Sequence, residues 1–264
     1  MKIAILGAGA FGTALGGILA EKGWDIDYYD SKLERERLSS VTAGAKYIVL
    51  AVPSNAVGYL VPHLPADIPL IVATKGVLLD DTFSRIRDVM VLSGPGFADD
   101  IKAHKPVTFT VTDARVKELF ATDYVRCEMT QDNRGVLMCG ALKNVYAIEA
   151  GMRKLQRGSA PWREYIEKAA GEMKAVLSVN GANPETVELS CGRGDLELTC
   201  GLPSRNYEYG LRLAEDAGVA PDKTVEGIST LARLRRGEIK IPADAEILRG
   251  LIVKSAKWRQ NGTK

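Results

Sequence analysis

A lysine stands alone in a helical stretch that is otherwise apolar, residues 135–151. Lys143 is the only charged residue between Gly135 and Glu149, and Asn144 follows it directly. An ammonium group in such surroundings costs several kcal/mol unless it is paired or opens onto a polar site. Lys143 is therefore half of a structural ion pair, a lysine that reaches the surface, or an acid–base group in a functional site.

A second group of polar side chains follows in a glycine-containing loop. Asp195 and Thr199 are four residues apart, so they share one face if this segment is helical. Arg205 and Asn206 begin another expected helix, and a guanidinium group suits a phosphate because it can donate two parallel hydrogen bonds. Arg193 could do the same and ranks below Arg205. Taken singly, each of these residues is better explained as a loop or capping residue.

A glycine-rich pattern lies at the start of the chain. An apolar run at residues 2–6 leads into G-A-G-A-F-G at residues 7–12, and a helical pattern follows. Gly7 allows a tight turn, Gly9 lets the backbone approach a pyrophosphate, and Gly12 lets helix and strand pack closely. The free N–H groups of the helix then face the phosphates. This spacing favours a dinucleotide-binding turn over the signal peptide that the small and apolar residues resemble.

Asp30 ends the next expected strand, near the offset at which an acidic residue binds the adenosine ribose. A carboxylate there repels a 2′-phosphate, so we expect NAD as the cofactor, with NADP as the alternative. Lys32 and Arg35 could pair with such a phosphate. The other interpretation of Asp30 is an ordinary turn residue.

The remaining patterns predict an α/β Rossmann-type N-terminal domain and an all-α C-terminal domain. Strand-like runs that end in polar, glycine-containing loops indicate a parallel sheet over residues 1–131, with the ligand at the carboxyl ends of the strands. Lys75 follows one such strand and is either a solvated loop lysine or a substrate contact. Helical periodicity dominates residues 132–264.

The amino-acid composition narrows the classes of molecule that this chain is expected to bind. The 264 residues are 46% hydrophobic with a net charge of +2, which gives no support for a nucleic-acid partner. No apolar run is long enough to span a bilayer. We expect a cytoplasmic protein with no metal and with reduced thiols, because the cysteines lack metal-ligand or paired spacing: Cys127, Cys139, Cys191 and Cys200.

Together the motifs resemble the soluble NAD(P)-dependent glycerol-3-phosphate dehydrogenase family. The matching segments run almost the length of the chain: GAGAFGTALG at 7–16, AVPSNAV at 51–57, ATKGV at 73–77, LSGPGFA at 92–98, GALKNVYAI at 140–148, GDLELTC at 194–200, SRN at 204–206 and VEG at 225–227. The resemblance implies a cleft between the two domains and reversible hydride transfer between NAD(P)H and dihydroxyacetone phosphate. It also implies a place in glycerophospholipid metabolism and a homodimer.

The resemblance implies a role for each matching residue. Lys143 is the general acid and base, with its pKa brought towards neutrality by its surroundings, and Asp195 orients it. The substrate is held by Lys75, Asn144, Thr199, Arg205 and Asn206. The cofactor is held by Gly7, Gly9, Ala10, Phe11, Gly12, Asp30, Pro53, Lys75, Ala98, Arg205 and Glu226.

Three departures from the family pattern keep alternatives open. The segment between Asp30 and Lys46 is short, so the sheet is expected to lack a strand. Leu137 replaces a usual glutamate, Gly96 replaces a small hydroxyl residue, and residues 153–161 lack the usual glycine-rich pattern. The alternatives are a related β-hydroxy dehydrogenase that reduces another small phosphorylated or 2-oxo substrate, and a non-catalytic NAD-binding protein.

Overall fold

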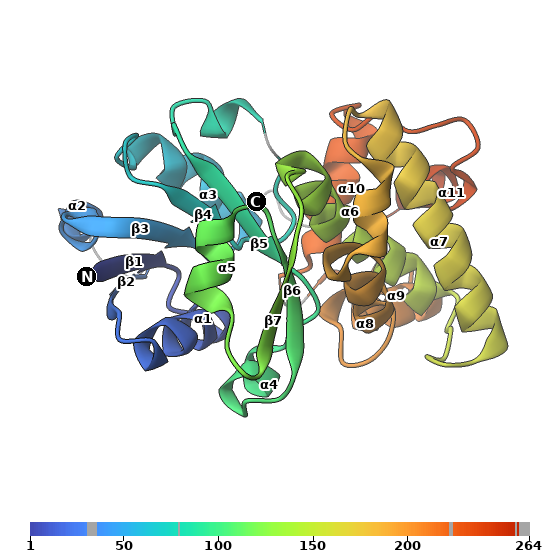
Figure 1. The fold of residues 1–264 in the computed structure, drawn as a ribbon. Helices are drawn as coiled ribbons and strands as arrows, with labels where there is room; N and C mark the ends of the chain where they lie inside the picture. Colours follow the sequence, from blue (N-terminus) through green and yellow to red (C-terminus); the bar gives the residue numbers. More distant parts are fainter. Residues whose placement is uncertain (31–35, 79, 222–223, 257, 259–264) are drawn as a thin grey trace. The chain divides into compact units, whose positions relative to one another are not determined.

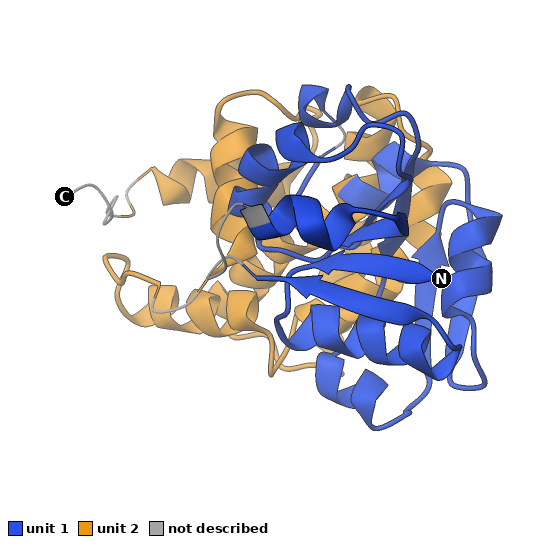
Figure 2. Cartoon of the chain, turned by 90° about the vertical axis from the view of Figure 1, so that its left-hand side faces the viewer, with its two compact units in different colours: residues 1–137 blue, residues 138–264 orange. Residues whose placement is uncertain are grey.

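The structure is a computed structural model that describes residues 1–30, 36–78, 80–221, 224–256 and 258 (Figure 1). The chain forms two compact units, unit 1 (residues 1–137) and unit 2 (residues 138–264) (Figure 2). Helix α6 (Asn133–Met152) begins in unit 1 and continues into unit 2. Lys32 and Arg35 lie outside the described residues.

Unit 1 is built on a seven-stranded sheet with the order β2-β1-β3-β4-β5-β6-β7. The strands are β1 (Lys2–Leu6), β2 (Asp25–Tyr29), β3 (Ala45–Leu50), β4 (Leu70–Val72), β5 (Val89–Ser93), β6 (Val107–Val111) and β7 (Val125–Met129). The chain winds outward from β1 in both directions, which creates a topological switch point at the carboxyl ends of β1 and β3.

The helices of unit 1 are α1 (Ala10–Glu21), α2 (Glu36–Thr42), α3 (Ser54–Leu60), α4 (Ala98–Lys102) and α5 (Ala114–Phe120). Alternate strand residues such as Ile3, Ile5 and Phe109 form a core with α1, α4 and α5 on one face of the sheet. This alternation follows from the two-residue period of a strand.

The sheet differs from the expected parallel one at its far end. β1 to β5 are parallel, whereas β6 pairs antiparallel with β5 and parallel with β7. The short connection through α4 turns the chain back instead of carrying it across the sheet, as a parallel neighbour would require. In the described part of the segment between β2 and β3, the chain forms α2 only, and β2 is an edge strand of the described sheet.

Among its described residues, unit 2 contains helices and no strand, as predicted. Besides the continuation of α6 it contains α7 (Ala160–Val179), α8 (Asp195–Thr199), α9 (Arg205–Glu215), α10 (Glu226–Arg235) and α11 (Glu246–Ser255). Residues 135–151 of α6 are all buried. The buried Glu172 carboxylate of α7 accepts the N–H groups of Ile247 and Leu248 at 2.8 and 3.3 Å and so caps α11.

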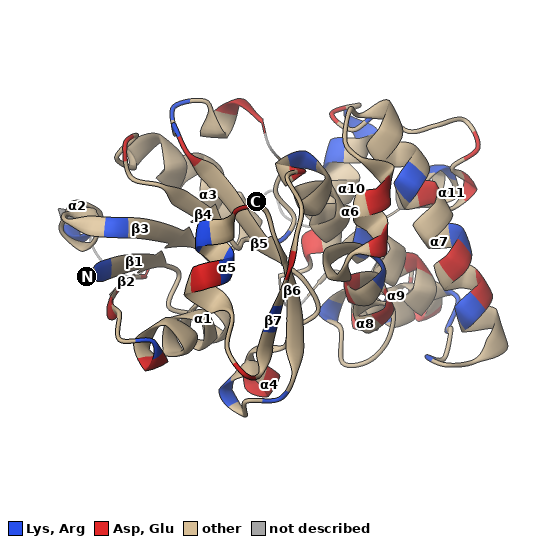
Figure 3. Cartoon of the chain, in the orientation of Figure 1, with Lys and Arg blue, Asp and Glu red and all other residues tan. Residues whose placement is uncertain are grey.

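Basic and acidic segments are interspersed over the strands and helices in view, in keeping with the small net charge (Figure 3). No helix in the described ranges has the length and apolar character needed to cross a membrane.

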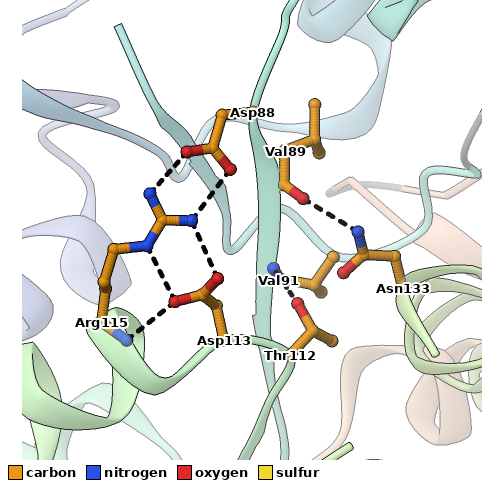
Figure 4. Close-up of polar contacts among 7 residues, drawn as sticks. All are labelled: Asp88, Val89, Val91, Thr112, Asp113, Arg115 and Asn133. Carbon is orange, nitrogen blue, oxygen red and sulfur yellow. Dashed lines mark hydrogen bonds and ion pairs between the residues drawn. The ribbon is translucent and has the colours of Figure 1, made fainter. Parts of the chain in front are cut away.

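Arg115 holds the junction between the parallel and antiparallel parts of the sheet (Figure 4). Its Nη1 and Nη2 donate to Asp88, just before β5, at 2.5 and 3.0 Å. Its Nε and Nη2 donate to Asp113, the N-cap of α5, at 2.9 and 2.8 Å. Nearby, Asn133 of α6 donates to the carbonyl of Val89 at 2.8 Å. These hydrogen bonds from Arg115 hold the pKa of Asp113 below its usual range.

We expect Arg115→Ala to lower the free energy of unfolding by about 0.5–1 kcal/mol at pH 7, a value discounted for solvent screening of these partly exposed groups. Because the folded pKa of Asp113 is depressed, this stabilisation is complete above the unfolded pKa and is lost as the pH falls through the folded one. Urea denaturation at pH 7 and about pH 3 checks this. Arg126 is an exposed arginine, so Arg126→Ala is the matched control. If Arg115→Ala lowered the free energy of unfolding by the same amount at both pH values, the prediction would be contradicted.

Candidate functional site

The turn between β1 and α1 is shaped by two close approaches of the backbone, at Gly7 and at Gly12. Gly7 has φ +112°, and a Cβ there would lie 2.5 Å from the carbonyl oxygen of Ala51. A Cβ at Gly12 would lie 1.9 Å from the carbonyl oxygen of Gly7. At Gly9, in contrast, a Cβ would meet nothing within 4 Å. The turn is therefore tight towards the sheet and open on its outer side.

The N-terminus of α1 faces this open side without a side-chain cap. Gly9 is the N-cap residue, and the first turn contains no acidic residue. Ala10 is exposed and Phe11 is partly buried. Uncapped N–H groups at an exposed helix start attract an anion. The turn thus fits the pyrophosphate of the dinucleotide that the sequence predicts.

The other predicted residues of unit 1 follow neighbouring strands. Asp30 comes directly after β2, whose last carbonyl, that of Tyr29, accepts the N–H of Gly7 at 2.8 Å. Asp30 therefore lies near the turn, where the ribose is expected. Three residues follow β3, β4 and β5 respectively, at the same edge of the sheet: Pro53, Lys75 and Ala98.

In unit 2 the structure brings Lys143 and Asp195 together. The Nζ of Lys143 donates to Oδ2 of Asp195, and the two side chains are 2% and 1% exposed. Lys143 thus does not reach the surface. Thr199 lies one turn further along α8, and its Oγ1 donates to the carbonyl of Asp195 at 2.5 Å and contacts Oδ1 at 3.4 Å. The predicted shared face of Asp195 and Thr199 is confirmed.

A π-helix (Ser190–Gly194) sets the start of α8 and therefore the place of Asp195. A Cβ at Gly192 would lie 2.2 Å from the carbonyl oxygen of Val187, so only glycine fits. Such π-helical turns are frequent next to functional residues.

Arg193, within the same π-helix, is held by two glutamates. Its Nη1 and Nη2 bind Glu167 at 2.6 and 3.0 Å, and its Nε binds Glu188 at 3.2 Å. These contacts favour a structural role for Arg193 over the phosphate contact that its residue type also suggests.

Two buried amides form a second network beside Lys143. Asn206 donates from Nδ2 to Oδ1 of Asn144 at 2.9 Å, and its own Oδ1 accepts the N–H of Gly227 at 2.9 Å. Asn144 also donates to the carbonyl of Gly140 at 3.1 Å. Asn206 thus joins α6, α9 and the start of α10. Two further predicted residues begin α9 and α10 respectively: Arg205, which is exposed, and Glu226.

Burial keeps the Cys200 thiol neutral, although the charge of Lys143 acts on it. Burial raises the pKa of Cys200, an effect that the positive charge of Lys143 opposes. All four cysteines are free and buried. Among the described residues, no three His, Cys, Asp or Glu side chains are grouped as metal ligands.

Two supporting residues were missed from the sequence. Ser204 is the N-cap of α9, where its side chain accepts the N–H of Tyr207 at 3.5 Å; a serine before an expected helix is a capping signal that could have indicated it. Trp162 donates from Nε1 to the carbonyl of Cys200, at the end of α8, at 2.7 Å. Nothing in the sequence pairs Trp162 with Cys200, since they meet through tertiary packing.

We expect Gly12→Ala and Gly17→Ala, both in α1, to have opposite effects. The Gly12 change forces a Cβ onto backbone and should cost about 1–3 kcal/mol and weaken dinucleotide binding. The Gly17 change meets nothing within 4 Å and should stabilise α1 by about 0.5–1 kcal/mol. Thermal denaturation measures the stability of each variant, and a fluorescence titration with NADH measures its dinucleotide binding. If the two variants had the same stability and the same affinity for NADH, the assignment of the turn would be refuted.

Known proteins share these motifs and this fold. Residues 132–251 match the family described as NAD-dependent glycerol-3-phosphate dehydrogenase C-terminus. Glycerol-3-phosphate dehydrogenase (NAD(P)+) of Leptospira biflexa is 32% identical, with 87% of this chain and 86% of that protein aligned. The protein of the same name from Desulfotalea psychrophila is 32% identical, with 81% and 79% aligned. The crystal structure of glycerol-3-phosphate dehydrogenase from Coxiella burnetii has a TM-score of 0.75 at 26% identity, over 95% of this chain and 94% of that chain. The chain therefore belongs to the NAD(P)-dependent glycerol-3-phosphate dehydrogenase family.

Proposed function

We propose that this chain transfers hydride reversibly between NAD(P)H and dihydroxyacetone phosphate, with sn-glycerol 3-phosphate as the reduced product. The observation that carries the proposal is the buried pair of Lys143 and Asp195. Asn144, which follows Lys143 in α6, accepts a hydrogen bond from Asn206 of α9. A buried ion pair of this kind is poorly explained by stability alone, because well-packed apolar residues are often as stable or more so.

Lys143 is the acid–base group in this proposal. The reduced nicotinamide supplies hydride to the carbonyl carbon when it is bound. The ammonium group of Lys143 donates a proton to the ketone oxygen, and in the reverse direction its amine accepts the hydroxyl proton. Asp195 accepts a hydrogen bond from Nζ and so orients the lysine, and Thr199 in turn contacts the Asp195 carboxylate.

The substrate phosphate is assigned to Arg205 and Asn206. Arg205 is exposed at the first position of α9, where its guanidinium group and the free N–H groups of the helix both favour an anion. Asn206 keeps one N–H of its amide for the substrate, as does Asn144. We also assign Lys75, which follows β4, to the substrate.

The cofactor is assigned to the turn of unit 1, with NAD preferred because Asp30 follows β2. Residues 1–131 then bind the dinucleotide, and residues 132–264 bind the substrate and carry the catalytic lysine. We also propose a cytoplasmic homodimer that serves glycerophospholipid metabolism. Size-exclusion chromatography with light scattering tests the dimer, and assays with NADH and NADPH test the preference.

We expect Lys143→Met to lower kcat with dihydroxyacetone phosphate by about a hundredfold or more, because the general acid is lost. The measurement is the decrease of NADH absorbance. The single change leaves Asp195 buried without its partner, which is destabilising. A double variant, Lys143→Met with Asp195→Asn, removes both charges and provides the folded control, and it should be equally inactive.

The same assay separates the alternatives. A folded wild-type protein that binds NADH yet turns over other small ketones would favour the related β-hydroxy dehydrogenase. One that binds NADH and reduces none of them would favour the non-catalytic binding protein. If Lys143→Met kept full activity, Lys143 would not be the acid–base group.

We expect Arg205→Ala to lower kcat/KM for dihydroxyacetone phosphate by about 10- to 100-fold, the value of a hydrogen bond to a charged group. The value for unphosphorylated dihydroxyacetone should not change, because that substrate has no phosphate to lose. Arg163→Ala, an exposed arginine of α7, is the matched control. Equal losses for both substrates would show that Arg205 does not bind the phosphate.

A further inference from the structure

Lys75 lies beside an aromatic ring from a distant part of unit 1. Its Nζ is 5.4 Å from the centroid of the Phe11 ring. Phe11 belongs to the first turn of α1, whereas Lys75 follows β4. Because β3 separates β1 from β4 in the sheet, the two residues meet only in the folded unit. The face of an aromatic ring attracts an ammonium group at this distance.

The Phe11 ring is supported from behind. It packs edge-to-face on Phe109 of β6, with ring centroids 6.4 Å apart and an angle of 79° between the planes. Phe109 is fully buried. The loop after β5 closes on it, since a Cβ at Gly96 would lie 3.1 Å from its ring. The core therefore fixes the orientation in which Phe11 meets the lysine.

We propose that the side chain of Phe11 positions Lys75 for the phosphorylated substrate, and that it connects substrate binding to the dinucleotide turn. This deepens the proposed function and rests on it, because Lys75 is a substrate contact there. Lysine has a flexible four-carbon side chain. A ring that restricts it before the substrate arrives reduces the rotamer freedom lost on binding.

The backbone of Phe11 provides the connection to the cofactor. It lies at the exposed N-terminus of α1, where the pyrophosphate is expected. A dinucleotide bound at this turn strengthens the constraint that the core already places on the ring, and the ring holds Lys75. Bound cofactor thus favours substrate binding, and bound substrate tightens cofactor binding by the same factor, because coupling between two sites is reciprocal.

The contact itself is tested on the protein without ligands. Reductive methylation with ¹³C-formaldehyde gives each accessible lysine an NMR methyl signal and keeps its charge. We expect the Lys75 signal, assigned with Lys75→Arg, to be shifted upfield by the Phe11 ring current. Phe11→Leu should abolish the shift. Phe120→Leu, a buried phenylalanine of the same core, should preserve it.

The functional part is tested by kinetics and binding. Phe11→Leu should raise KM for dihydroxyacetone phosphate by about 2- to 30-fold, with most of the loss in KM rather than in kcat. Phe11→Trp should retain a low KM because tryptophan has the strongest cation–π face. In a Lys75→Met background, Phe11→Leu should have no further effect. The factor by which sn-glycerol 3-phosphate tightens NADH binding should be smaller in Phe11→Leu.

The NMR test and the kinetic test can fail independently, and each failure overturns a different claim. An unshifted Lys75 signal in the wild type overturns the positioning contact. An unchanged KM in Phe11→Leu, or additive effects with Lys75→Met, overturns its role in substrate binding. A wild type with the shifted signal but no turnover of dihydroxyacetone phosphate overturns the proposed function and leaves the contact standing.

Discussion

The buried ion pair between Lys143 and Asp195 is the constraint on which unit 2 depends. Both charges have left water almost completely, which costs several kcal/mol per ion unless the pairing geometry is good. The surroundings meet this requirement with backbone geometry. The π-helix before Asp195 requires glycine at position 192, because a Cβ there would clash with the backbone of Val187. Ion pairs from Arg193 to Glu167 and Glu188 hold the same segment on its exposed side. Between Gly135 and Ile148, α6 carries no charged residue other than Lys143, and Asp195 neutralises its charge.

Unit 1 solves a different problem, which is to bring backbone N–H groups to an open surface. Gly7 and Gly12 allow turn, strand and helix to approach more closely than side chains permit. The carboxyl ends of the parallel strands then carry Asp30, Pro53, Lys75 and Ala98 to one edge, because parallel strands all end on the same side. The connection to the antiparallel strand β6 starts at the same edge, because Ala98 is the first residue of α4.

Single residues connect several elements at both places. Asn206 accepts from Gly227 and donates to Asn144, so a residue assigned to the substrate also fixes the start of α10. Phe11 contributes its backbone to the first turn of α1 and its ring to the surroundings of Lys75. Because each of these residues contacts several elements, a substitution there should affect every element that the residue joins.

Local patterns in the sequence determined the order and type of the elements, the glycine turn, the isolation of Lys143 and the helical spacing of Asp195 and Thr199. These features depend on neighbours within a few residues, where side-chain period and backbone sterics act directly. Only the tertiary structure decided that Lys143 pairs with Asp195, that Arg193 is held by Glu167, that β6 turns antiparallel, and that Lys75 lies over Phe11. Each of these joins residues far apart in the chain, and such contacts are chosen by the packing of the whole core rather than by any local preference.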